Sequence, residues 1–85
     1  MEVSMSEILF YGTQWCGDCR RSKAFLAKHD IPYTYIDLEE HPTLIEEVVR
    51  RNDGLRSIPT IVFPDGSHLT EPSDQELGAK LGLAV

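Results

Sequence analysis

Apolar residues occur along the chain in short runs whose composition suits β-strands. Aromatic and β-branched side chains fit a pleated, half-buried surface, so each run predicts a strand. The predicted strands are Glu7–Gly12, Tyr33–Leu38 and Thr60–Phe63. A turn at Pro64–Ser67 leads into a fourth short strand, His68–Thr70, and the pair predicts a hairpin.

Helical signals stand between the strands and at the end of the chain. The first predicted helix, Cys16–Asp30, holds good helix formers and cannot continue through Pro32. The last helix opens with the capping box Ser73–Glu76 and is expected to bury Leu77 and Leu81.

The middle helix is predicted to start near Pro42, because proline suits the first helical turn. Either His41 or Thr43 is the expected cap, since Glu46 follows Thr43 at the spacing of a capping box. The apolar residues that follow recur at helical spacing, and Gly54 is expected to end the helix.

The predicted order is β-α-β-α-β-β-α, which indicates an α/β fold. The first strand–helix–strand unit should be right-handed and parallel, whereas the closing hairpin must be antiparallel. Three helices would then cover both faces of a four-stranded mixed sheet. With 85 residues, 41% of them hydrophobic, the chain has material for one core, so we expect a single domain over residues 1–85.

The charge and the hydropathy argue against several classes of protein. The net charge of −6 is the opposite of what a nucleic-acid binder shows. No segment approaches the roughly 20 apolar residues of a membrane span. Residues Met1–Glu7 lack the basic start and the apolar stretch of a secretory signal, so we expect a cytoplasmic protein.

The two cysteines of the chain lie three positions apart, at Cys16 and Cys19. A disulfide between them closes too small a loop to restrain the unfolded chain, which favours a reactive pair over a structural one. Cys16 opens the first helix, where free N–H groups and the helix dipole favour a thiolate, so it is the candidate nucleophile. Cys19 is placed to resolve a mixed disulfide on Cys16, whereas the charge of Asp18 opposes thiolate formation.

Other polar residues have simpler expected roles. A C-x-x-C pair could be half of a zinc site, but the three histidines fall in separate predicted elements, so we expect no metal. The histidines should have surface or cap roles. Arg20, Arg21 and Lys23 are expected to form a solvated helix face that could offset Asp18, and Arg56 either reaches a substrate carboxylate or stays a surface charge.

Three motifs, in order, carry a resemblance to a known family. They are Tyr11–Cys19, Ser57–Thr60 and Leu69–Asp74, and they resemble the glutaredoxin superfamily, most closely its mycothiol-linked mycoredoxins. The resemblance implies the thioredoxin/glutaredoxin fold and a thiol–disulfide oxidoreductase that removes a low-molecular-weight thiol from proteins. It also implies no bound cofactor, because mycothiol or glutathione acts as a co-substrate.

The resemblance further implies which residues bind the thiol. Pro59 is expected to be cis and to face the cysteines, which leaves the backbone of Ile58 free to pair with a substrate. Ser73 and Asp74 match the place where glutaredoxins hold the charged end of glutathione, in addition to capping a helix. The candidate thiol-binding residues are Trp15, as a platform beside the nucleophile, Ser57, Ile58, Pro59, Ser73 and Asp74.

Two departures from the family bear on the choice of thiol. Glutaredoxins usually carry a lysine three residues before the nucleophile, and here that residue is Thr13. They often have a Gly-Gly pair ahead of the last helix, and here the sequence is Thr70-Glu71-Pro72. Both departures favour a bulkier, less anionic thiol, so mycothiol is preferred over glutathione.

Two alternatives remain open from the sequence. One is a redoxin that a thioredoxin-type reductase recharges and that donates electrons to an enzyme such as a ribonucleotide reductase or a peroxidase. The other is a carrier that shares an iron–sulfur centre across a dimer. The expected partners are protein mixed disulfides and a small thiol, with no nucleic acid or membrane, and the expected state is a monomer.

Overall fold

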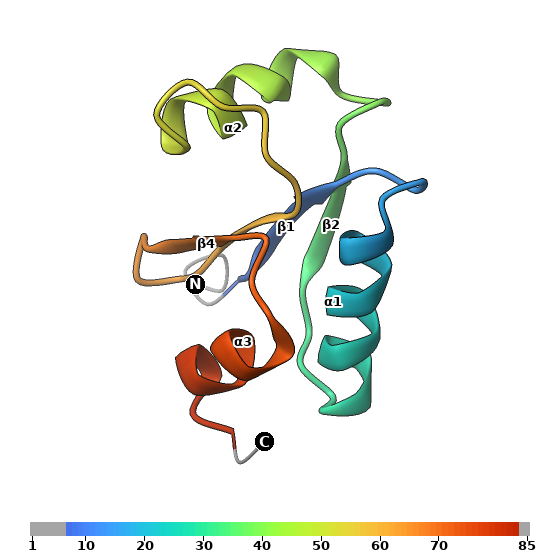
Figure 1. Ribbon diagram of the computed structural model, residues 1–85, viewed down its shortest axis with the longest axis vertical. Coiled ribbons are helices and arrows are strands. Elements are labelled where there is room, and N and C mark those ends of the chain that lie inside the picture. The colour runs from blue at the N-terminus through green and yellow to red at the C-terminus, as the bar shows by residue number, and fades with distance from the viewer. Residues whose placement is uncertain (1–6, 84–85) are drawn as a thin grey trace.

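The computed structural model describes residues 7–83 of the chain and has the predicted order of elements (Figure 1). A short 3₁₀ turn, η2, runs directly into α2. The elements are β1 (Leu9–Gly12), α1 (Gly17–Lys28), β2 (Thr34–Asp37), η2 (Pro42–Leu44), α2 (Ile45–Arg51), β3 (Thr60–Val62), β4 (His68–Thr70) and α3 (Asp74–Leu81).

The four strands form one mixed sheet in the order β2-β1-β3-β4. β1 is parallel to β2, with Leu9 opposite Thr34, and antiparallel to β3, with Phe10 opposite Ile61. β3 and β4 form the predicted antiparallel hairpin. The predicted α/β fold with a four-stranded mixed sheet is therefore confirmed.

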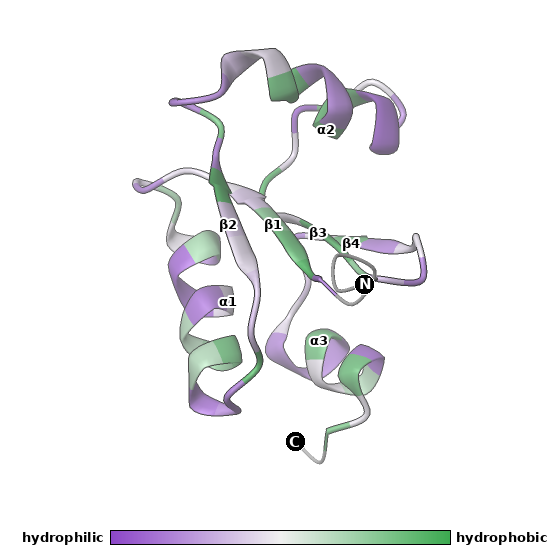
Figure 2. Ribbon diagram, turned by 180° about the vertical axis from the view of Figure 1, so that it is seen from behind, coloured by the Kyte–Doolittle hydropathy of each residue, from purple (hydrophilic) through white to green (hydrophobic). Residues whose placement is uncertain are grey.

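Helices cover both faces of this sheet, with α1 and α3 on one side and α2 on the other (Figure 1). Successive side chains of a strand point to opposite faces, so Phe10 enters the core under α1 and α3, whereas Tyr11 enters the core under α2. Figure 2 shows the resulting hydrophobic centre along β1 and β3. Leu77 is fully buried and Leu81 packs against the first core, as predicted for the last helix.

The start of the middle helix differs from the prediction. The chain first makes a 3₁₀ turn at Pro42–Leu44, with His41 as its N-cap and no side-chain capping bond at either helix start. The predicted capping box between Thr43 and Glu46 is therefore wrong. The backbone N–H of Leu44 bonds to the carbonyl of His41 at 2.9 Å, which places Thr43 inside the turn instead of ahead of it.

The end of the same helix is also earlier than Gly54. The helix ends at Arg51, and the Asn52 side chain donates to the carbonyl of Val48 and to Thr60 Oγ1, both at 2.9 Å. Gly54 has a φ of 93° and returns its N–H to the carbonyl of Val49 at 2.8 Å, so it closes the turn beyond the helix. Asn52 thus ties α2 to β3 at a point that the apolar pattern does not mark.

The predicted capping box of the last helix is confirmed. Ser73 Oγ accepts the N–H of Glu76 at 3.0 Å, and the Glu76 carboxylate accepts the N–H of Ser73 at 2.9 Å.

None of the helices within residues 7–83 has the length and the apolar character that a membrane span requires. The predicted lack of a secretory signal concerns Met1–Glu7, which lies almost wholly outside the described residues.

Candidate active site

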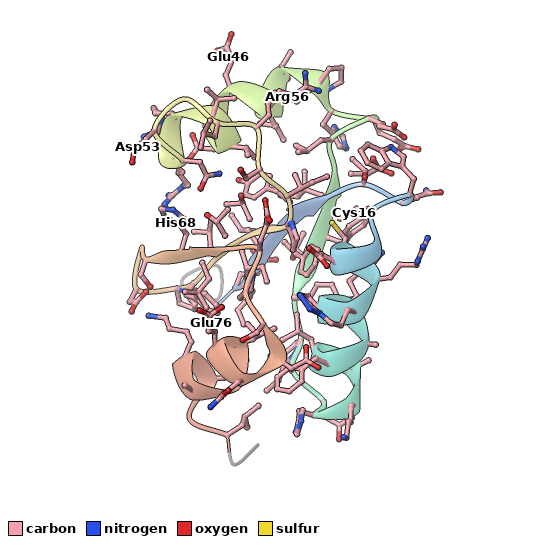
Figure 3. The ribbon with its side chains drawn as sticks, in the orientation of Figure 1. Cys16, Glu46, Asp53, Arg56, His68 and Glu76 are labelled. Carbon is pink, nitrogen blue, oxygen red and sulfur yellow. The ribbon has the colours of Figure 1, made fainter. Side chains whose placement is uncertain are left out.

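Cys16 is the N-cap residue of α1, directly after the turn that follows β1. Its backbone is extended, with φ −82° and ψ 117°, and its sulfur accepts the N–H of Cys19 at 3.1 Å. The residue is 8% exposed, so the protein covers most of it. Figure 3 shows Cys16 at the end of α1 with its sulfur directed toward the middle of the molecule.

Cys19 lies behind Cys16 and is fully buried. Its sulfur packs against the backbone of Gly12, where an added Cβ would come within 2.7 Å of Cys19 Sγ. Glycine at the end of β1 therefore makes the space for the second thiol, because any larger residue would collide with it. Both cysteines are free thiols in the structure, Cys16 as the N-cap of α1 and Cys19 within its first turn.

The environment of Cys19 strongly disfavours its thiolate. Burial is the main cause that raises the pKa of Cys19 from an ordinary value of 9.0 to about 12. A hydrogen bond to Cys16 and the charge of Cys16 raise it further, whereas a backbone hydrogen bond from Thr13 and the charge of Lys23 lower it. The Cys19 thiol therefore keeps its proton at neutral pH.

This raised pKa predicts a loss of stability in alkali. Stability linked to Cys19 is complete below its unfolded pKa near 9 and is lost as the pH rises from 9 toward 12, because the unfolded chain releases the proton first. At pH 10.5 the loss relative to pH 8 should be about 2 kcal/mol.

Urea unfolding under reducing conditions at the two pH values measures this loss. The Cys19→Ala variant should lack it, and the losses that come from Tyr11 and Tyr35, whose pKa values burial also raises, remain in both proteins. Equal pH dependence in the two proteins would contradict the assignment.

The loop before β3 forms the opposite wall of the site. The Ile58–Pro59 peptide bond is cis, as the family resemblance implies, and Pro59 is buried. The Thr60 hydroxyl donates to the carbonyl of Ser57 at 2.8 Å, and the N–H of Glu71 donates to the carbonyl of Pro59 at 2.8 Å. Ile58 packs against both cores, including the one that holds Cys16 and Cys19. Two hydrogen bonds and the packing of Ile58 thus hold this loop beside the cysteines.

A pocket of about 500 Å³ opens beside the residue that precedes Cys16. Trp15 forms one side of it, is 65% exposed, and donates its indole N–H to a carboxylate oxygen of Glu39 at 2.6 Å. The other lining residues come from the β1–α1 turn, the end of β2, η2, α2 and the loop before β3, and they are Thr13, Leu38, Glu39, Pro42, Ile45, Val48, Arg56 and Ile58. Figure 3 shows Arg56 beside α2, and Cys16 at the end of α1 that is nearer to α2.

Ser73 and Asp74 do not line this pocket but form the start of α3. Arg21 links that start to α1. It donates to the carbonyl of Pro72 at 2.8 Å, and its guanidinium lies 3.8 Å from Asp74 and 3.9 Å from Asp18. The expected pairing of Arg21 with Asp18 is therefore present, but the side chain is only partly solvated because it also contacts Asp74 and the carbonyl of Pro72.

Sequence reasoning missed other members of the site. Lys23, also predicted to be solvated, places its ammonium 3.9 Å from the centre of the Tyr35 ring. Glu39 is a charged residue in a turn, 24 positions from Trp15, and no local pattern links the two.

No group of three potential metal ligands occurs in the part of the chain that the structure describes.

The family model named Glutaredoxin matches residues 8–69. The chain belongs to the glutaredoxin family. A Mycobacterium tuberculosis protein named as a glutaredoxin is 43% identical over 74 residues, which cover 87% of this chain and 88% of the relative. Mycoredoxin 1 of Corynebacterium glutamicum is 36% identical over 77 residues, covering 91% of this chain and 95% of the relative. The glutaredoxin-like protein NrdH of Lactococcus lactis is 29% identical over 58 residues, covering 68% and 78%.

A solved glutaredoxin also has the same fold. The crystal structure of a glutaredoxin from Archaeoglobus fulgidus superimposes with a TM-score of 0.77 at 27% identity, covering 93% of this chain and 89% of that one. Glutaredoxins are thiol–disulfide oxidoreductases that use a small thiol as co-substrate, so this protein is a glutaredoxin-like redox protein. The resemblance inferred from the three sequence motifs is confirmed.

Proposed function

We propose that this protein reduces mixed disulfides between proteins and a low-molecular-weight thiol, with mycothiol preferred over glutathione. The position of Cys16 carries the proposal, because its sulfur caps α1 and accepts the N–H of Cys19 at 3.1 Å. That hydrogen bond and the positive end of the helix stabilise negative charge on the sulfur, both before it attacks and after it leaves a mixed disulfide. Cys16 is the proposed nucleophile and Cys19 the proposed resolving thiol.

The first step exchanges one disulfide for another. The Cys16 thiolate attacks the sulfur that belongs to the small thiol, the S–S bond of the substrate breaks, and the protein thiolate leaves and takes up a proton. Cys16 now carries the small thiol as a disulfide. The backbone of Ile58 next to Pro59, together with Ser57, is proposed to align the extended part of the substrate.

The second step returns Cys16 to its thiolate. A second molecule of small thiol attacks the adduct, forms the small-molecule disulfide and releases Cys16. In the other route Cys19 attacks Cys16, expels the small thiol and leaves an intramolecular disulfide that a later two-electron reduction must open. Burial keeps the pKa of Cys19 high, so the route through free small thiol is favoured.

Two features support an uncharged thiol over glutathione. Glutathione carries an ammonium group and two carboxylates, and the lysine that usually binds a carboxylate is here Thr13. At the start of α3, Arg21 lies 3.8 Å from Asp74 and offsets the charge that would attract the ammonium. Mycothiol has neither kind of charge, so these two changes cost it no interaction.

Adduct formation tests the proposal. The Cys19→Ser variant is incubated separately with the disulfides of mycothiol and of glutathione, and the Cys16 adduct is identified by mass and timed. We expect the mycothiol adduct to form at least about tenfold faster, which corresponds to about 1.4 kcal/mol of preference. Equal rates would contradict the thiol preference, and the absence of both adducts would contradict the role of Cys16.

The likeness to NrdH, a relative named only as glutaredoxin-like, favours one further candidate. In that candidate the Cys16–Cys19 disulfide is reduced directly by a thioredoxin-type reductase, and the protein passes the electrons to another enzyme. Oxidised protein is mixed with such a reductase and NADPH in the absence of small thiol. Rapid loss of NADPH would support this candidate, whereas our proposal expects loss only after mycothiol or another reduced thiol is supplied.

A further inference from the structure

The loop between α2 and β3 carries the backbone that is proposed to align the substrate, yet its first part lies in solvent (Figure 1). Asp53–Arg56 is exposed throughout, and Asp53 and Gly54 have positive φ values of 55° and 93°. Ser57 and Ile58, which follow, are only half-buried. Backbone with few buried contacts has little rigidity of its own. The placement of Ser57 and Ile58 therefore depends on bonds from neighbouring elements.

Asn52 closes the base of this loop. Its amide group donates to Thr60 Oγ1 at 2.9 Å, across eight positions of the chain, and to the carbonyl of Val48 at 2.9 Å. The Thr60 hydroxyl in turn donates to the carbonyl of Ser57 at 2.8 Å. Asn52 Oδ1 accepts a hydrogen bond from the hydroxyl of Thr70 on β4. One amide side chain thus joins α2, β3 and β4 to the loop.

These bonds form a chain in which every hydrogen points toward Ser57. Thr60 has a single hydroxyl hydrogen, and it is free for the Ser57 carbonyl because Asn52 presents an N–H to Thr60 and not an oxygen. Thr60 is fully buried, and donors linked in such a chain polarise one another. The amide at residue 52 therefore decides which way the Thr60 hydroxyl faces.

The other end of the same short segment is held by β4. The N–H of Glu71, one residue after the end of β4, donates to the carbonyl of Pro59 at 2.8 Å. The carbonyls of Ser57 and Pro59, on either side of Ile58, are thus both bonded. The backbone groups of Ile58 between them are the ones proposed above to pair with a substrate.

We propose that Asn52 is a positioning residue: by turning the Thr60 hydroxyl onto the Ser57 carbonyl, it fixes the backbone that binds a peptide group of the substrate. The inference rests on the proposed function for the reaction at Cys16. Asn52 does not itself line the pocket beside Trp15. Because a small misplacement of a bound substrate slows its reaction, loss of this bond should slow those substrates that use the loop.

The Asn52→Asp variant reverses the chain at its centre. The carboxylate keeps the shape and still accepts from Thr70, but it has no N–H to give, so it competes with Ser57 for the Thr60 hydroxyl. We expect kcat/KM for a mycothiolated peptide to fall about fivefold, and kcat/KM for hydroxyethyl disulfide, which has no peptide group, to stay within about twofold. An equal fall with both substrates, or no fall with the peptide, would overturn the positioning role.

Two variants of Thr60 separate the hydrogen bond from the added charge of aspartate. Thr60→Val removes the hydroxyl without adding charge and should reproduce the selective fall, whereas Thr60→Ser keeps the hydroxyl and should restore most of the rate. Adding Thr60→Val to Asn52→Asp should cost little more, because both changes remove the same bond to Ser57. Fully additive losses would show that the two residues act independently and would overturn the proposal.

Two further variants control for stability. Thr70→Val removes the far end of the chain at a half-buried position and should lower kcat/KM for the peptide about twofold, so it keeps the test available if Thr60→Val does not fold. Leu81→Ala removes packing on α3, away from the chain of bonds. It should leave the ratio of the two kcat/KM values unchanged. If Leu81→Ala shifts that ratio as much as Asn52→Asp does, the inference is overturned.

Amide NMR of the reduced protein without substrate supplies a readout besides activity. The N–H of Ile58 belongs to the same peptide group as the Ser57 carbonyl, so its resonance responds to the bond from Thr60. We expect Asn52→Asp and Thr60→Val to shift this resonance in the same direction, and Thr60→Ser to return it toward its original position.

The two readouts distinguish this inference from the proposed function. If the Ile58 resonance shifts but Cys16 forms no adduct with any disulfide, the chain of bonds is supported and the proposed function fails. If Cys16 forms its adducts while Asn52→Asp neither shifts the resonance nor slows the peptide selectively, the role of Asn52 is overturned and the proposed function stands.

Discussion

Replacing Cys16 with serine should abolish the reduction of mixed disulfides, whereas replacing Cys19 with serine should leave turnover with free small thiol within about threefold of the original rate. Serine keeps the shape of both sites, but its hydroxyl supplies no thiolate at neutral pH. Loss of the attacking atom should therefore lower turnover by at least about 10³-fold. Rates with a mycothiolated peptide and excess mycothiol measure both effects.

The tolerance expected at Cys19 follows from its surroundings. Burial holds its pKa at about 12, so little of it is thiolate at neutral pH. Once Cys16 is bound in a mixed disulfide, the charge of Cys16 no longer raises that pKa, but the burial remains. Free thiol in solution therefore competes well with Cys19 for the adduct. A Cys19→Ser variant that is inert with every small thiol would show that the route through free thiol is wrong.

The sequence predicts the fold well because its signals are local. Each strand is a short run of apolar residues, and the capping box at Ser73 and the turn at Pro64–Ser67 each lie within four residues. The position of Cys16 at a helix start depends only on the strand before it and the helix after it. The same holds for the spacing of Cys19, which one helical turn brings back to Cys16.

The parts that the sequence did not predict depend on contacts between distant residues. Arg21 meets the start of α3 more than 50 positions away, and Trp15 meets Glu39 across 24 positions. The true end of α2 depends on Asn52, which bonds to Thr60 and to Thr70 on neighbouring strands. In each case a polar side chain finds its hydrogen-bond partner on an element that packs beside its own. No periodicity in the sequence marks such a pairing. The pocket beside Trp15 arises in the same way, because four separate segments line it: the β1–α1 turn, the end of β2, η2 with α2, and the loop before β3.

The choice of thiol should be reversible at Thr13. Restoring lysine in Thr13→Lys places an ammonium in the pocket, where its stem covers apolar surface and its charge can bond a carboxylate of glutathione. A hydrogen bond to a charged group contributes about 1.5–3 kcal/mol, so kcat/KM for glutathione mixed disulfides should rise at least about tenfold. The same value for mycothiol mixed disulfides should fall several-fold, because the longer lysine side chain takes up space in the pocket beside Trp15.

The measured quantity is the ratio of the two kcat/KM values. An added ammonium near Cys16 stabilises its thiolate toward every disulfide, and the ratio cancels that common effect. Glu40→Gln changes the net charge of −6 by the same one unit at an exposed position outside the pocket, so it controls for the overall field. A ratio that shifts equally in both variants would assign the preference to net charge. A ratio that shifts only in Thr13→Lys places the discrimination at the one residue where this chain departs from lysine.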